Sequence, residues 1–170
     1  MTEAESLGAV TEFLSGLRRR GWRMEPARAE APELLSAAHE VAIPEGWRAV
    51  LERFSLLVDE HESRWFLSAA DYAGTSDSAF AWNAFEQLSL EAAVDDADRR
   101  RSTDFWREFL PIALGVAGSY EYLAISRVSG VVVHGAEPEF EEVTLLADDL
   151  PEFLAGVADG SLGADFFGKS

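Results

Sequence analysis

The acidic stretch at residues 135–142, GAEPEFEE, holds the side chains with the clearest potential for chemistry. Its carboxylates belong to Glu137, Glu139, Glu141 and Glu142. If the segment is extended, residues 137, 139 and 141 project to one side and Phe140 anchors the other. Carboxylates this close repel one another unless water, a cation or a basic protein meets them. The pattern therefore predicts either a solvated acidic loop or an edge that docks a basic partner.

A second acidic cluster lies in the turn DEHES at residues 59–63. Asp59, Glu60 and Glu62 form a second binding patch if the two hairpins lie side by side. Their chemistry would suit a metal ion, but consecutive positions of one exposed turn do not converge on a single point. We therefore expect a solvated turn and no metal site.

Catalytic motifs are missing from the sequence: it has no G-x-S-x-G elbow, no phosphate-binding P-loop, no G-x-G-x-x-G and no H-E-x-x-H. Its histidines are His39, His61 and His134. His134 is either a general base beside Glu137 or a strand-end histidine bonded to the backbone, and the second interpretation is favoured. We expect no enzyme, no catalytic residue and no cofactor. A deep cleft in which His134 meets two carboxylates would argue against that expectation.

The acidic stretch is positioned by a predicted antiparallel meander. Runs of aromatic and β-branched residues predict strands at 120–126, 131–133 and 141–147, and turn residues such as Ser129-Gly130 separate them. Asp149 is the predicted N-cap of a closing helix whose apolar face runs from Leu150 to Val157. This meander and its helix are the predicted core.

The rest of the chain predicts helices followed by a strand pair and more helix, which makes the fold class α+β, an antiparallel sheet meander flanked by helices. Helices are expected at residues 3–20, 32–40, 47–54 and 79–90, and from 99 to Pro111 with Asp98 as cap. The strand pair is expected at 55–59 and 64–68. We predict a single domain over residues 1–170, with a helical extension at 1–42 and a loose tail at 159–170 onto which Phe166 and Phe167 could dock.

The net charge of −17 is the main clue to partners. Residues 111–170 are the more densely acidic part, with 10 acidic and 2 basic side chains. Such a field repels nucleic acid and anionic membranes and favours a basic protein, although solubility alone is the simpler explanation. The chain has no cysteine, no apolar run of bilayer length and no N-terminal signal pattern, so we expect a cytoplasmic protein.

Four stretches, in this order, resemble the SUKH superfamily in its Smi/Knr cell-wall-regulator branch. They are IPEGWRAVLERF (43–54), RWFLSAADYAGTSDSAFAWNAFEQLSLEAA (64–93), FWREFLPIALGVAGSYEYLAI (105–125) and GVVVHGAEPEFEEVTLLADDLPEFLAGV (130–157). Asp71-Tyr72, the run GTSD at 74–77, Trp82, and Trp106 followed by Pro111-Ile112 look like the bacterial members.

The resemblance implies an α+β domain that works by binding and brings no catalytic residues with it. Bacterial members are largely immunity proteins, each of which neutralises a cognate toxin of a polymorphic or contact-dependent system, often a nuclease. Fungal members are interaction hubs that regulate cell-wall synthesis. The resemblance thus leads us to expect an immunity protein that binds a basic toxin, with an intracellular regulatory scaffold as the alternative.

Overall fold

The computed structural model describes residues 2–167 and builds them around one seven-stranded antiparallel sheet. The strands follow the chain in the order β1-β2-β3-β4-β5-β6-β7, so each one pairs with its neighbour in sequence. Their bounds are β1 Arg23–Pro26, β2 Phe54–Val58, β3 Arg64–Phe66, β4 Phe109–Gly115, β5 Glu121–Ser126, β6 Val132–Ala136 and β7 Val143–Ala147. The predicted α+β class and the antiparallel meander are confirmed.

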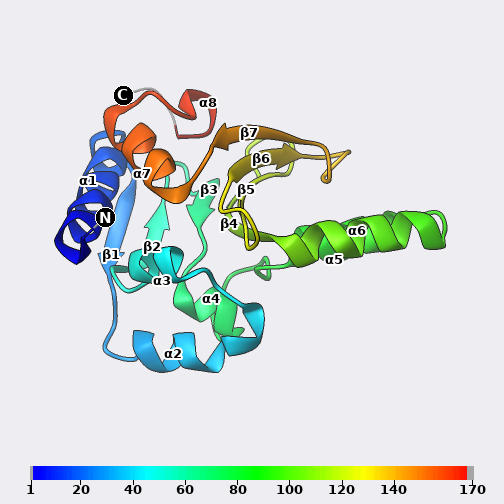
Figure 1. The fold of residues 1–170 in the computed structure, drawn as a ribbon, viewed down its shortest axis with the longest axis horizontal. Helices are drawn as coiled ribbons and strands as arrows, with labels where there is room; N and C mark the ends of the chain where they lie inside the picture. The colour runs from blue at the N-terminus through cyan, green and yellow to red at the C-terminus, as the bar shows by residue number, and fades with distance from the viewer. Residues whose placement is uncertain (1, 168–170) are drawn as a thin grey trace.

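Helices cover the sheet and flank it (Figure 1). Their bounds are α1 Glu3–Arg19, α2 Ala31–Ala37, a 3-10 turn His39–Val41, α3 Glu45–Leu51, α4 Ala69–Ala73, α5 Ala84–Ala92, α6 Asp96–Glu108, α7 Leu150–Asp159 and α8 Ala164–Phe167. α1, α7 and α8 lie together, and α5 and α6 form an arm that projects from the body (Figure 1). None of the helices described here is long and apolar enough to cross a bilayer.

The core on one face of the sheet is aromatic. Phe66 of β3 meets Phe13 of α1 at 5.4 Å between ring centroids, and it also contacts Trp47 and Phe167. α1 and α7 pack so tightly that a Cβ on Gly16 would lie 2.8 Å from the backbone of Ala158. On the other face, Tyr122 of β5 meets Trp106 of α6 at 5.0 Å and also Phe85 of α5.

Local sequence explains where the best-predicted elements begin. Thr2 caps α1 in a capping box, because its hydroxyl accepts from Glu5 N and the Glu5 carboxylate accepts from Thr2 N. Asp149 caps α7 by accepting from Glu152 N at 2.8 Å, and Gly160 ends that helix with positive φ. The predicted Asp149 cap and the apolar face of α7 are confirmed, whereas the Thr2 cap of α1 was not predicted.

Several predictions were wrong. Strands β1 and β4 and helix α4 were not expected, so residues 1–42 are not a purely helical extension. α6 begins at Asp96 with Asp95 as its cap, in place of Asp98. The tail at 159–170 is not loose as far as the structure describes it, because Phe166 and Phe167 are buried and Trp22 Nε1 donates to Phe167 O at 3.0 Å. Residues 168–170 of the predicted tail lie outside the described residues.

Arg127, in the turn after β5, ties this turn to two distant segments. Its guanidinium donates to four main-chain carbonyls, those of Val41, Ala42, Trp106 and Arg107, at 2.8–3.2 Å. Burial lowers the pKa of this guanidinium from its ordinary value. The contacts join the end of α6 to the connection between the 3-10 turn and α3.

Candidate partner-binding surface

The acidic loop at residues 137–142 connects β6 to β7 and is held to the body by Phe140. The Phe140 side chain is buried, and its ring stacks on Phe85 of α5 at 5.1 Å between centroids. Tyr122 also contacts the Phe140 ring, and its hydroxyl donates to the Phe140 carbonyl. The predicted anchoring role of Phe140 is confirmed, and it fixes the loop against the base of the arm.

The carboxylates of this loop do not all project outward, as an extended segment would require. A turn breaks the alternation, because Glu142 N donates to Glu139 O at 3.0 Å. Glu141 is half-buried and accepts from the hydroxyls of Ser89 and Ser102 on the arm. The row therefore reduces to three exposed side chains, Glu137, Glu139 and Glu142.

Glu137 is exposed but partly fixed. Its Oε1 accepts from Tyr120 N at 2.8 Å, and its own N–H donates to Tyr120 O at 2.9 Å. These bonds join the loop to the connection between β4 and β5. Glu139 and Glu142 are exposed, and no ion pair reaches any of the three carboxylates within residues 2–167. Glu137, Glu139 and Glu142 are therefore the carboxylates of the loop that no basic side chain of the described residues neutralises.

The second predicted patch is only partly at the surface. Asp59 is buried, and its carboxylate accepts from Ser63 N at 2.8 Å, from Ser63 Oγ at 3.0 Å and from Arg64 N at 3.1 Å. Asp59 thus shapes its own turn, a common use of aspartate, and its oxygens are not free for a partner. Glu60 and Glu62 are exposed, and Glu62 pairs with Arg23 at 2.9 Å. An exposed pair of this kind contributes little to stability.

The two acidic turns lie at the same end of the sheet but not side by side. The connection between β4 and β5 lies between them, because the strands follow one another in order. Four strand spacings separate the turns, which is about 19 Å at the usual spacing of roughly 4.8 Å. This exceeds the Debye length of about 8 Å at physiological salt. The turns therefore act as two separate patches, which only a partner of comparable width could contact together.

His134 lies beside Glu121 of the neighbouring strand and does not bond to the backbone as predicted. Its Nε2 is 3.8 Å from Glu121 Oε2, and Arg64 Nε lies 3.1 Å from Glu121 Oε1. The neighbouring His134 imidazole, and then the hydrogen bond from Arg64, hold the pKa of Glu121 below its ordinary value against the opposing effect of burial. A carboxylate held ionised in this way is a weak base.

A cavity of about 500 Å³ lies over His134 between β5–β7 and α8. Two carboxylates, those of Glu121 and the exposed Asp165, line it together with Leu123, Leu146 and Phe166. His134 and two carboxylates at one cavity are part of the arrangement that would favour an enzyme. The described lining offers the Thr144 hydroxyl as its one alcohol, and Glu121 is already paired with Arg64. No group of three possible metal ligands occurs among residues 2–167.

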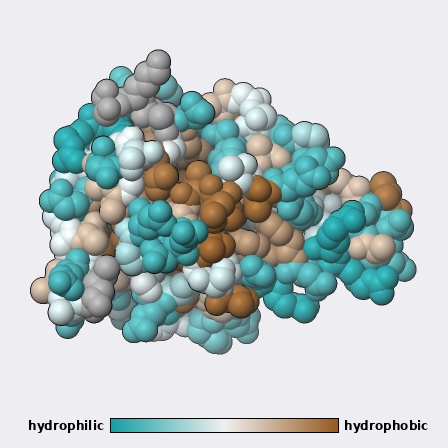
Figure 2. All heavy atoms as spheres, turned by 45° about the horizontal axis from the view of Figure 1, so that its top comes forward, coloured by the Kyte–Doolittle hydropathy of each residue, from teal (hydrophilic) through white to brown (hydrophobic). Residues whose placement is uncertain are grey.

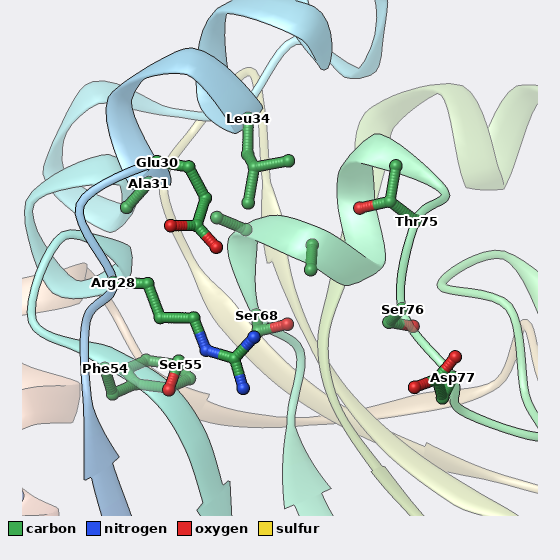
Figure 3. A pocket seen from close by; sticks show the side chains of 12 residues that line it. Arg28, Glu30, Ala31, Leu34, Phe54, Ser55, Ser68, Thr75, Ser76 and Asp77 are labelled. Atoms are coloured by element: carbon green, nitrogen blue, oxygen red, sulfur yellow. The ribbon is translucent and has the colours of Figure 1, made fainter.

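A pocket of about 290 Å³, which was not predicted, lies between α2, α4 and β2 (Figure 3). Arg28 reaches into this pocket and Glu30 lies above it (Figure 3). The hydroxyls of Ser68 and Ser76 that line it already donate to the buried carboxylate of Asp71. An adjoining groove of about 630 Å³ runs past Trp65 and Phe80. Residues of α4 line both hollows and Arg23 of β1 lines the groove, and the sequence predicted neither element.

An exposed tryptophan beside an acidic patch would suit a binding hot spot, but Trp22 and Trp82 are packed inward. Trp22 is buried against Phe66 and Phe167, and Trp82 is half-buried beside Tyr72.

Comparison of the chain with protein-family models, with curated proteins and with solved structures found no match. Any family or function proposed for this chain therefore rests on the sequence resemblance and on the surface described above.

Proposed function

We propose that this protein is a non-enzymatic protein-binding module, and specifically an immunity protein that neutralises a cognate bacterial toxin by binding it. The toxin would belong to a polymorphic or contact-dependent system, and a nuclease is one candidate. The observation that supports this proposal is the anchored loop that presents Glu137, Glu139 and Glu142 without ion-pair partners among the described residues. The resemblance to the SUKH superfamily supplies the class of function.

Electrostatic attraction favours a basic partner at this surface. A protein of net charge −17 attracts a basic partner from a distance, and steering of this kind raises association rates by 10- to 1,000-fold at low salt. Carboxylates on a fixed loop can occupy the positions that nucleic-acid phosphates take on a nuclease. Because Phe140 holds the loop in place, the partner meets the charges without a large ordering cost.

Charge reversal at Glu139 and Glu142 tests the proposal. Both side chains are exposed and make no side-chain hydrogen bond in the described structure, so lysine at these positions should leave the fold intact. The double variant Glu139→Lys/Glu142→Lys should weaken protection of cells that express the toxic product of the adjacent gene. It should also flatten the salt dependence of toxin binding in calorimetric titrations.

The matched control changes the net charge equally at a distance from the loop. Glu12→Lys/Glu33→Lys alters two exposed carboxylates, one on α1 and one on α2. This variant should protect as well as the wild-type protein. Full protection by the loop variant would remove Glu139 and Glu142 from the interface, and equal losses in both variants would show that net charge alone matters.

The cavity over His134 favours one second candidate, an acid–base enzyme. A His134→Ala protein that protects cells like the wild type would dispose of it. The regulatory-scaffold alternative predicts instead that the adjacent gene product is harmless and that the partner is a resident cell protein. Expression of the adjacent gene alone separates these two binding functions.

A further inference from the structure

β7 is the outermost strand of the sheet, and its backbone edge is open. No other described strand or helix lies beyond this edge in Figure 1, and apolar residues gather in the middle of the face that Figure 2 turns towards the viewer. Val143 is 36% exposed and Leu145 is 55% exposed, high values for large apolar side chains in a sheet. An edge of this kind can pair with another strand.

The hydrogen-bond pattern shows which β7 groups point outward. At the two ends of β6, Ser126 N donates to Val131 O and Glu137 N donates to Tyr120 O, so the odd-numbered residues of this segment face β5. His134 therefore faces β7, where its partner is Thr144. Because antiparallel strands alternate, the N–H and C=O groups of Val143 and Leu145 point away from the sheet. No turn, loop or side chain of residues 2–167 bonds to them.

The two edge strands differ in proline and charge, although the strand pairing is irregular at both, between Glu25 and Pro26 of β1 and opposite Val132 and Val133 in β7. β1 contains Pro26, which has no N–H, and Arg23, which pairs with Glu62. The five residues of β7, VTLLA, include neither proline nor charge. Proline and charge are the usual means by which edge strands avoid unwanted pairing. β7 is thus the edge that accepts a strand more readily.

Charges at both ends of β7 determine which strand can add there. Glu139 and Glu142 precede the strand, and Asp148 follows it, all exposed. If a second copy of this chain paired antiparallel about Leu145, the Glu142 end of each β7 would lie near the Asp148 end of the other, and symmetry would repeat the contact. Like charges directly opposite one another destabilise a strand pair. A strand with lysine or arginine at both ends would instead be attracted by the carboxylates that repel a second copy.

We propose that β7 is a strand-addition site for an extended segment of a basic protein partner, which pairs with the outward groups of Val143 and Leu145. The segment has about five uncharged β-forming residues, a length of roughly 17 Å, with basic residues on both sides. As the binding mode of a toxin, this inference rests on the proposed function. The site itself follows from the open edge and its flanking carboxylates.

The test uses the full chain labelled with ¹⁵N and three synthetic peptides, KKVTVTVKK, EEVTVTVEE and KKGSGSGKK. The first should shift the Val143 and Leu145 amide resonances and slow their hydrogen exchange. The acidic peptide should fail because of its charge, and the glycine-rich one because it does not form a strand. Leu145→Pro removes one outward N–H and should weaken binding of KKVTVTVKK about tenfold or more, whereas Leu145→Thr keeps this N–H and should bind like the wild type.

Each outcome decides the matter. Equal binding of the three peptides, protection at amides other than those of β7, or undiminished binding by Leu145→Pro would overturn the proposal, and so would self-association through β7. If Leu145→Pro does not fold, Val143→Pro and a KKVTVTVKK peptide N-methylated at its central valine test the same bonds. If a folded Leu145→Pro protein still protects cells against the toxin, β7 is not the toxin-binding site, and the proposed function stands. If the peptide binds at β7 but the protein does not neutralise the toxin, the strand-addition site stands and the proposed function is wrong.

Discussion

Replacement of Phe140 with alanine should destabilise the protein by about 4 kcal/mol, because this side chain anchors the acidic loop. Truncation of a buried phenylalanine costs about 3–5 kcal/mol. Phe140 is 6% exposed, and its ring stacks on Phe85 at 5.1 Å, a contact that alanine cannot make. Such aromatic contacts contribute about 0.5–1.5 kcal/mol beyond area burial, so we expect a cost in the upper part of the range for phenylalanine truncation. Since domains are stable by about 5–15 kcal/mol, the variant should still fold at 25 °C.

Urea denaturation followed by tryptophan fluorescence measures this loss, with Leu145→Ala as the control. Leu145 is 55% exposed and its truncation should change the free energy of unfolding by less than about 1 kcal/mol. The amide protons of Tyr120 and Glu137, which lie in the bonds that join the loop to its neighbour, should also exchange faster in Phe140→Ala. A loss below about 1 kcal/mol in Phe140→Ala, or unchanged exchange at these two amides, would refute the view that Phe140 holds the loop.

Three further variants test other contacts. His134 and Arg64 lower the pKa of Glu121 in the folded state, so the stabilising effect of this carboxylate is present above its ordinary pKa of 4.5 and is lost as pH falls through the lower folded value. Glu121→Gln should therefore remove this part of the acid dependence in urea titrations at pH 3–7, and a curve like that of the wild type would show that the contacts of Glu121 with His134 and Arg64 are unimportant. Arg127→Met leaves four carbonyls without their donor and should cost about 2–4 kcal/mol in the free energy of unfolding, where a neutral result would contradict the described bonds. A Cβ at Gly135 would lie 2.5 Å from the Tyr122 ring, so Gly135→Ala should cost about 1–3 kcal/mol and lower the melting temperature, whereas an unchanged melting curve would show that the ring moves freely.

The elements that the sequence predicted well carry local signals. α1 and α7 begin at side-chain caps, and turn residues separate β5, β6 and β7. The missed elements lack such signals. β4 is buried along most of its length, so its apolar run does not alternate, and it follows α6 without a turn. β1 is a short polar edge strand whose pairing with β2 comes from a segment about 30 residues further along the chain.

The acidic site was predicted only in part, for a related reason. Composition located the loop, and the position of Phe140 indicated its anchor. The sequence could not distinguish an exposed carboxylate from one that accepts hydrogen bonds, as Asp59 does within its own turn and Glu141 does across the base of the arm. Ser89 and Ser102 reach Glu141 from 52 and 39 residues away, so this contact depends on the tertiary fold.

Charge and the bare edge of β7 are physically linked. Two charges 5 Å apart in water repel by about 0.8 kcal/mol, and the antiparallel pairing of two copies would create two such contacts, with Glu142 near Asp148 and the reverse. A total of about 1.7 kcal/mol is comparable to what a short strand pair gains, because isolated two-stranded pairs are marginal in water. The flanking carboxylates can therefore keep copies of the chain apart without any proline or charge inside β7. The same carboxylates attract a strand with basic ends, so the charges that prevent self-pairing also select the partner.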